Sequence, residues 1–393
     1  MFDWSDDALD ALRGECDPEV DSLIEQLLAW LVAEGHVSVD QASARTLLGT
    51  LIGWLHSPEA AANTLLDEYR ADAPALPEWV SVDELRRGGD FFNEYSLPIC
   101  AALLCASLPI AYSAARGSQV LLVTTELMSD ARRRLAETTQ MVFDVAEVGA
   151  AAASDAPHPL APGSRGLATC RNVRLFHAAV RCFVRRDPDG VAGWASAERQ
   201  LGLPLGEPIN QEDLIGTLLT FGPAVLEALE EMGIRYDRRG AAGYLHLWSA
   251  AGHLLGVRPD LLPLEGRDAH HVHQLIRRRH QLPSRAGAEL ADALLAEMRR
   301  TLPLPLAGLA PALIRRLAGP KTADMLDIRD APIFELALDV AAAANRALSP
   351  LYRFAPMRLV TDPLMRRVLR NYQQGGLRAP RRGPFDFTPV AVR

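Results

Sequence analysis

Apolar residues recur at three- and four-residue intervals through nearly the whole chain, which is the period of an amphipathic α-helix. Alanine, leucine and arginine dominate the composition and β-branched residues are sparse, so intrinsic propensity favours the same structure. The sequence therefore predicts an all-α fold. The expected helices cover residues 18–34, 39–70, 120–148, 167–186, 211–232, 244–257, 286–301 and 333–347.

Proline and glycine mark the expected connections between these helices. Three prolines and two glycines between Gly149 and Arg165 oppose regular structure and predict a loop. A proline-containing link is expected from Pro74 to Pro77, and the tail from Gln373 onward is expected to be irregular.

Charge and length exclude several classes of protein. With 393 residues, 49% of them hydrophobic, the chain is long enough for one large domain or two ordinary ones with a real core. All but Lys321 of the 41 basic residues are arginine, but 49 acidic residues outnumber them and the net charge is −8. This balance argues against a nucleic-acid partner.

The first residues and the cysteines indicate in which cellular compartment the protein is expected. The acidic run from Phe2 to Asp10 has neither the basic nor the apolar region of an export signal. The five cysteines are odd in number and form no C-x-x-C pair, so a reducing cytoplasm is expected.

One uncharged stretch, Tyr95 to Ala115, is about as long as a membrane-spanning helix. Pro98, Pro109 and four serines weaken that interpretation. We expect a buried helix that is broken or kinked near Pro109, and no stable membrane span.

The expected helix over residues 120–148 carries two polar residues in an apolar stripe. Arg134 and Thr138 occupy positions of the stripe that Leu127 and Met141 define, so both should face the core. A buried guanidinium needs an anion or several acceptors. A structural ion pair with a carboxylate such as Glu137 would satisfy it, and so would a bound anionic cofactor or a polarised oxygen species.

The next expected helix presents His177 on an apolar face with Val173 and Phe176, and Arg181 follows one turn later. A single histidine on an apolar face is most often a core residue with its hydrogen bonds satisfied. The alternative is a metal or haem ligand, with Arg181 in reach of a haem propionate.

A third cluster contains His270, His271, His273 and His280, among three consecutive arginines from Arg277. His273 and His280 share a helical face, so a non-haem metal site is one interpretation. The adjacent arginines would repel a cation, and the cluster is therefore expected to be a solvated, pH-sensitive face.

The common motifs of nucleotide-binding and hydrolytic enzymes are absent from the sequence: G-x-x-x-x-G-K-[ST], G-x-G-x-x-G, H-E-x-x-H and G-x-S-x-G. Nucleotide-dependent chemistry and the common hydrolase mechanisms are thereby disfavoured.

Four segments together resemble the catalytic domain of the rubber oxygenase family, which includes the latex-clearing proteins. They are VLLVTTELMSDARRRLAETTQMVFDV at 120–145, VRLFHAAVR at 173–181, PINQEDLIGTLLTFG at 208–222 and YLHLWSAAGHLLG at 244–256. The resemblance implies an all-helical fold with a globin-like core that holds a b-type haem. It also implies an enzyme that uses dioxygen to cleave carbon–carbon double bonds of isoprenoid chains. The implied organisation is an N-terminal helical extension over 1–80, a haem-binding oxygenase-like catalytic domain over 81–372 and an irregular tail over 373–393.

Position by position, the resemblance implies roles for the residues that the helical stripes had placed inward. His177 matches the axial ligand of the haem iron, and Arg181 matches a haem-propionate or pocket contact. Arg134 and Thr138 match the distal arginine and threonine, and Arg134 counts among the haem-binding residues as well.

The chain departs from the rubber-cleaving members in one catalytic position and in its compartment. They resemble one another in a lysine just before the distal threonine, whereas Glu137 stands there in this chain and could accept a proton. A cytoplasmic protein would not meet a solid polymer, so a small lipophilic substrate of isoprenoid or polyketide type is expected. The leading hypothesis is a haem b oxygenase, and the alternative is a non-catalytic helical protein that binds a hydrophobic ligand in the same cavity.

Overall fold

The computed structural model describes residues 2–36, 44–55, 57, 60, 63–71, 75–128, 131–147, 156–188, 193–301 and 308–348. Across these ranges the regular elements are helices, and the extended pairing is limited to one isolated bridge between Ala114 and Gln281. The predicted all-α class is confirmed. The expected tail from residue 373 lies outside the described residues.

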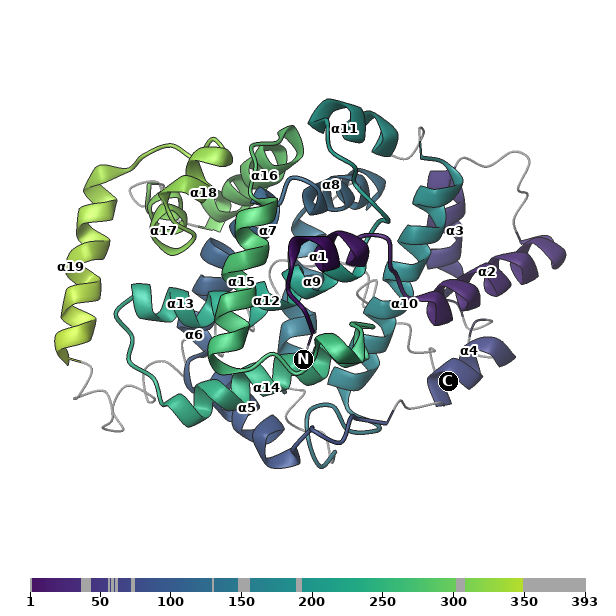
Figure 1. The fold of residues 1–393 in the computed structure, drawn as a ribbon, viewed down its shortest axis with the longest axis horizontal. Coiled ribbons are helices and arrows are strands. Elements are labelled where there is room, and N and C mark those ends of the chain that lie inside the picture. Colours follow the sequence, from purple (N-terminus) through teal and green to yellow (C-terminus); the bar gives the residue numbers. More distant parts are fainter. Residues whose placement is uncertain are drawn as a thin grey trace.

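The helices follow one another along the chain as labelled in Figure 1. The bounds are α1 Asp6–Leu12, α2 Pro18–Ala33, α3 Ala44–Leu55, α4 Thr64–Ala71, α5 Val82–Glu94, α6 Ser96–Ala102, a π-helical segment Leu103–Ser107, α7 Leu108–Ser113, α8 Gly117–Met128, α9 Ala131–Val145, α10 Arg165–Arg186, α11 Trp194–Leu201, α12 Gln211–Phe221, α13 Pro223–Glu231, α14 Arg238–Leu254, a 3₁₀ turn Pro259–Leu261, α15 Gly266–His280, α16 Arg285–Thr301, α17 Leu309–Leu317, α18 Pro320–Met325 and α19 Pro332–Leu348.

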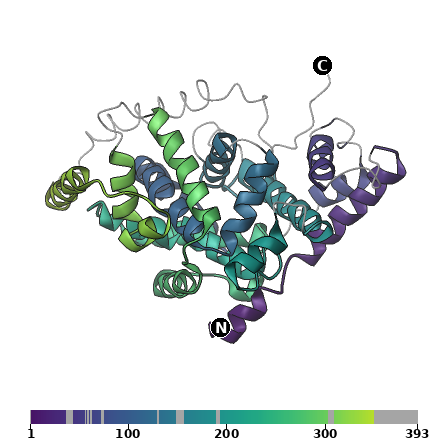
Figure 2. The same ribbon diagram turned by 90° about the horizontal axis from the view of Figure 1, so that it is seen from above.

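Helix α10 joins two hydrophobic cores. Its N-terminus is capped by Ser164, whose hydroxyl accepts a hydrogen bond from the amide of Leu167 at 3.1 Å. Val173 belongs to the larger core, whereas Val180 and Phe183 pack in a second core with α2 and α3. Helices α2–α4 lie at one end of the long axis and α19 at the other (Figures 1 and 2). Helix α10 thus connects the N-terminal helices to the rest of the protein.

Two glycines allow close packing between α5 and α14. A Cβ atom at Gly88 would lie 2.4 Å from the carbonyl oxygen of Gly243, and one at Gly243 would lie 3.0 Å from the amide nitrogen of Gly88. Because no side chain fits between the two backbones, each helix requires glycine at its contact point.

Three of the expected helices are divided in the structure. Residues 120–148 form α8 and α9, residues 211–232 form α12 and α13, and residues 39–70 contain α3 and α4. The second division falls at Gly222, directly before Pro223, because proline is favoured in the first turn of a new helix but cannot continue an old one.

The uncharged stretch around Pro109 runs through α6, the π-helical segment and α7. The predicted distortion near Pro109 is confirmed, and it takes the form of the π-helical segment that directly precedes the turn containing the proline. The span Ser96–Ser113 is long and apolar enough to cross a membrane, and 44% of it is buried inside the protein.

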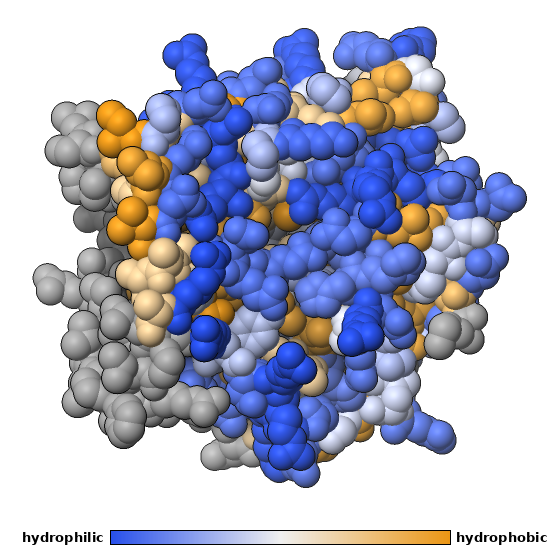
Figure 3. All heavy atoms as spheres, turned by 60° about the vertical axis from the view of Figure 1, so that its left-hand side comes forward, coloured by the Kyte–Doolittle hydropathy of each residue, from blue (hydrophilic) through white to orange (hydrophobic). Residues whose placement is uncertain are grey.

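The surface is mainly hydrophilic on the face drawn in Figure 3, with hydrophobic side chains in small groups. The most exposed large apolar side chains of the described residues are Ile333, Leu336 and Val340 on α19. The many arginines and acids of the sequence thus lie largely where water solvates them.

Candidate functional site

A largely apolar cavity of about 580 Å³ lies between helices from the middle and later parts of the chain. This volume falls in the range of about 300–1,000 Å³ that is usual for cofactor and small-molecule sites. The wall is formed by α6, the π-helical segment, α7, α8, α9, α10, α12, α15 and α16. Its apolar part includes Leu97, Leu103, Leu104, Leu108, Leu121, Leu135, Met141, Val142, Phe143, Val173, Phe176, Leu218, Phe221, Ile276, Leu294 and Met298.

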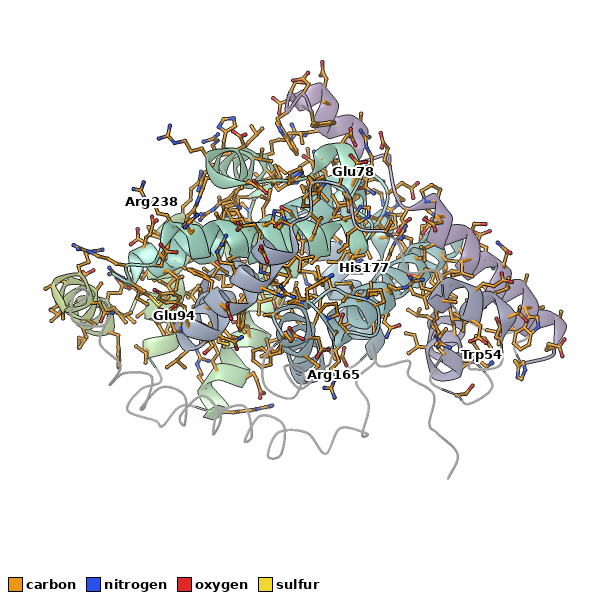
Figure 4. The ribbon with its side chains drawn as sticks, turned by 90° about the horizontal axis from the view of Figure 1, so that it is seen from below. Trp54, Glu78, Glu94, Arg165, His177 and Arg238 are labelled. Carbon is orange, nitrogen blue, oxygen red and sulfur yellow. The ribbon has the colours of Figure 1, made fainter. Side chains whose placement is uncertain are left out.

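His177 lies on this wall, in the interior of the molecule (Figure 4). Its side chain is half-buried and borders the cavity. Neither ring nitrogen has a hydrogen-bond partner among the described residues, and Nδ1 is completely buried. Burial and the positive charge of Arg181 lower the pKa of His177 to about 3, against the opposing effect of Asp17. His177 is therefore a neutral imidazole at physiological pH with an uncommitted nitrogen.

The residues expected opposite His177 lie on α9. Thr138 is half-buried on the cavity wall, and the buried side chain of Glu137 also lines the cavity. The backbone of Arg134 belongs to α9, but its side chain lies outside the described residues. The structure thus brings Glu137, Thr138 and His177 to one cavity.

Arg181 points to a different neighbour. Its side chain is buried and its Nε donates a hydrogen bond to Asp21 Oδ1 at 2.7 Å, while Nη1 lies 3.4 Å from the carbonyl oxygen of Ile209. Arg181 is absent from the cavity wall, and its Nη2 has no hydrogen-bond partner. The ion pair with Asp21 attaches the C-terminal half of α10 to α2.

The expectation of a solvated histidine face on α15 was wrong. His273 and His280 are buried and line the cavity, whereas His270 is half-buried and His271 is exposed. The error has a physical reason: consecutive residues point in different directions around a helix, so Arg278 is exposed while Ile276 and Arg277 share the inward face with the two buried histidines. No group of three metal-ligating side chains occurs among the described residues, so the interpretation as a non-haem metal site has no support there.

Sequence reasoning missed a buried charged cluster beside His280. Glu212 Oε1 lies 2.8 Å from His280 Nε2 and 3.0 Å from Arg279 Nε, and Oε2 lies 3.2 Å from Arg13 Nη1. The His280 contact is close but not aligned as a linear hydrogen bond. Burial works to raise the pKa of Glu212, yet His280, Arg13 and Arg279 outweigh it and lower the pKa to about 2. Glu212 is therefore ionised and closes one polar end of the cavity.

The signal for this cluster in the sequence is weak. Arg13 and Glu212 are 199 positions apart, and nothing in their local pattern pairs them. Only the capping residue Asn210, whose side chain accepts from the amide of Asp213 at 2.9 Å, indicates that a helix begins beside Glu212.

Fold and site define an all-α protein built around a largely apolar cavity with a neutral histidine on its wall. The model of the family "ER-bound oxygenase mpaB/B'/Rubber oxygenase, catalytic domain" matches residues 86–347, about two thirds of the sequence. The chain belongs to this oxygenase family, as the sequence motifs predict.

Two similar proteins agree with the family match. A rubber oxygenase from Streptomyces sp. (strain K30) is 24% identical over 364 residues, which cover 89% of this chain and 83% of the relative. A solved structure of latex clearing protein in the closed state matches with a TM-score of 0.65 and 22% identity, covering 86% of this chain and 84% of that one. The structural match establishes the shared fold.

Proposed function

We propose that the chain is a haem b-dependent oxygenase that acts on a small lipophilic substrate of isoprenoid or polyketide type and cleaves a carbon–carbon double bond with dioxygen. The observation that carries the proposal is His177, a neutral, half-buried imidazole with an uncommitted nitrogen on a largely apolar cavity wall. An axial haem ligand must be neutral and unpaired at its coordinating nitrogen, so the residue fits that role.

The cavity also fits the cofactor in size and chemistry. It lies in the usual range for a cofactor site, and its walls are mainly aliphatic and aromatic, as a porphyrin face requires. A haem bound there would supply iron for the activation of dioxygen, and the protein would supply orientation and electrostatics.

The side chains of α9 would then act on the open side of the cavity. The Thr138 hydroxyl can donate a hydrogen bond to an oxygen atom placed in the cavity, and the Glu137 carboxylate can accept a proton from a reacting group. Arg134 would add positive charge on the same helix. The aliphatic residues around them exclude water, which strengthens each of these interactions.

Arg181 has a positional role in this proposal. Its ion pair with Asp21 holds α10 against α2 one turn after His177 and so fixes the imidazole in the wall. A contact with a haem propionate would use Nη2, the nitrogen that has no partner.

The cavity and the relatives support the proposed substrate class. The rubber oxygenase named above acts on an isoprenoid polymer, and the family shares its catalytic domain with this chain. A cavity of about 580 Å³, part of which haem would fill, suits a small molecule. We further propose that the protein works in the cytoplasm, on a substrate made there.

The absorption spectrum of the purified protein tests the proposal. We expect a Soret band with one haem per chain, a band shift on exposure of the reduced protein to dioxygen, and loss of bound haem in His177→Ala. His246→Ala is the control, because His246 is also a helical histidine inside the protein but pairs with Glu265 and lies off the cavity wall.

Two results would count against the proposal. Unchanged haem content in His177→Ala would refute the assignment of His177 as the haem ligand. A wild-type protein that stays colourless after expression with a haem precursor would favour the non-catalytic binding protein, for which Glu137 in place of the family's lysine is the sequence argument.

A further inference from the structure

Most polar groups on the cavity wall are already committed to protein partners. Ser107 Oγ donates to the carbonyl oxygen of Thr220 at 2.5 Å. The Gln281 amide donates to Thr322 Oγ1 at 2.9 Å, and Arg277 Nη2 donates to the same hydroxyl at 2.9 Å. Groups paired in this way need nothing from a ligand.

His273 differs from them. Its side chain is only 3% exposed, it lies on the cavity wall, and neither of its ring nitrogens has a hydrogen-bond partner among the described residues. A buried polar atom without a partner costs free energy, so such a group in a cavity wall indicates that the partner arrives with whatever fills the cavity.

Glu227 on α13 determines which nitrogen of His273 is available. Its Oε1 accepts hydrogen bonds from Gln274 at 3.0 Å and from His270 at 3.2 Å, and its Oε2 lies 3.8 Å from His273 Nε2. That separation is too long for a hydrogen bond, but the negative charge favours the tautomer with its hydrogen on Nε2.

The second nitrogen, Nδ1, is then a lone-pair acceptor. Nε2 is completely buried, whereas Nδ1 keeps accessible surface, and His273 lines the cavity. Burial, with the nearby charge of Arg277, lowers the pKa of His273 to about 4 against the opposing effect of Glu227, so the ring is neutral at physiological pH. A neutral acceptor facing a largely apolar cavity calls for a donor on the ligand.

We propose that His273 is a substrate-recognition residue, and that the lipophilic substrate carries a hydroxyl group that donates a hydrogen bond to His273 Nδ1. This inference rests on the proposed function, because it assigns a feature to the substrate of the same cavity. A pure hydrocarbon would leave Nδ1 unpaired, and an aldehyde or ketone offers only a second acceptor. The hydroxyl thus also sets the orientation of the chain in the cavity.

The test measures dissociation constants by calorimetry for three C10 isoprenoid probes of one skeleton: the alcohol, the aldehyde and the hydrocarbon. We expect the alcohol to bind tighter than both others. In His273→Phe the preference should fall about fivefold, the value of one neutral hydrogen bond. His273→Gln, which keeps an acceptor, should retain part of the preference. His271→Phe places the same change on the exposed side of α15 and should leave the preference unchanged.

Three results of the binding measurements would overturn the inference: equal affinities for alcohol and hydrocarbon in the wild type, a preference that survives in His273→Phe, or an equal loss of preference in His271→Phe. The haem absorbance of every sample is recorded alongside. Loss of haem from His273→Phe would assign the imidazole to the cofactor and overturn the inference as well. A wild type without haem would refute the proposed function, while the probe affinities would still decide for or against the hydroxyl.

Discussion

Glu212→Gln should remove the charge that holds the polar end of the cavity together. The carboxylate is fully buried and lies within 3.2 Å of Arg13, Arg279 and His280. Glutamine has nearly the same shape, so the substitution changes charge without opening a void. The three cationic or potentially cationic partners would then face a neutral amide.

The magnitude follows from the pKa of Glu212, which falls from 4.5 to about 2 on folding. Each pKa unit corresponds to about 1.4 kcal/mol, so the ionised carboxylate contributes about 3 kcal/mol to the free energy of unfolding at neutral pH. Because the folded pKa is the lower one, this contribution is present above pH 4.5 and is lost as the pH falls toward 2.

Urea unfolding followed by circular dichroism measures both effects. Glu212→Gln should be less stable than the wild type by about 3 kcal/mol at pH 7, and the difference should shrink steadily below about pH 4.5. Glu19→Gln is the control, because Glu19 also pairs with an arginine, Arg174 at 3.0 Å, but its side chain is 71% exposed. Glu19→Gln should lower the free energy of unfolding by less than about 1 kcal/mol. A loss that small in Glu212→Gln, or one independent of pH, would refute the reasoning.

Two further predictions concern helix packing and the buried imidazole. Gly88→Ala should lower the free energy of unfolding by about 2–3 kcal/mol, because its Cβ has no room against Gly243. Gly53→Ala, on an open face of α3, should raise the free energy of unfolding by about 0.5–1 kcal/mol. Equal shifts of the melting temperature in the two variants would contradict this. His177 has a folded pKa of about 3 and an ordinary value of 6.5, so the unfolded chain takes up the proton first and acidification destabilises the cofactor-free protein. Between pH 7 and pH 5 the free energy of unfolding of His177→Phe should therefore fall by about 2 kcal/mol less than that of the wild type. Parallel profiles of unfolding free energy against pH in the two proteins would contradict that.

The sequence predicted local structure well where one helix decides the outcome. The apolar stripe that contains Val173 and Phe176 places His177 inward, and the structure puts it on the cavity wall. The same stripe continues to Val180, which packs in the other core against α2 and α3. Periodicity shows which side of a helix is buried, but it does not show which neighbour buries it.

The α15 histidines and the Arg13–Glu212 pair show where this reasoning stops. Arg277, Arg278 and Arg279 are consecutive, so they point in different directions around the helix, and their charge says little about the face that carries His273. Arg13 meets Glu212 only because α1 folds back onto α12 and α15. Such a contact depends on the tertiary arrangement, which local spacing does not contain. The domain boundaries at residues 80 and 372 stay predictions.

The charged contacts of α1 also constrain the order in which the chain can fold. Asp6 and Asp10 bind Arg279, and Arg13 binds Glu212, across separations of 273, 269 and 199 residues. A ribosome that adds roughly 5–20 residues per second makes the intervening chain over a period on the order of ten seconds to a minute. During that time the first helix has none of its ionic partners. Helix α1 therefore reaches these contacts only after α12 and α15 have been made, and the polar end of the cavity is completed at that stage.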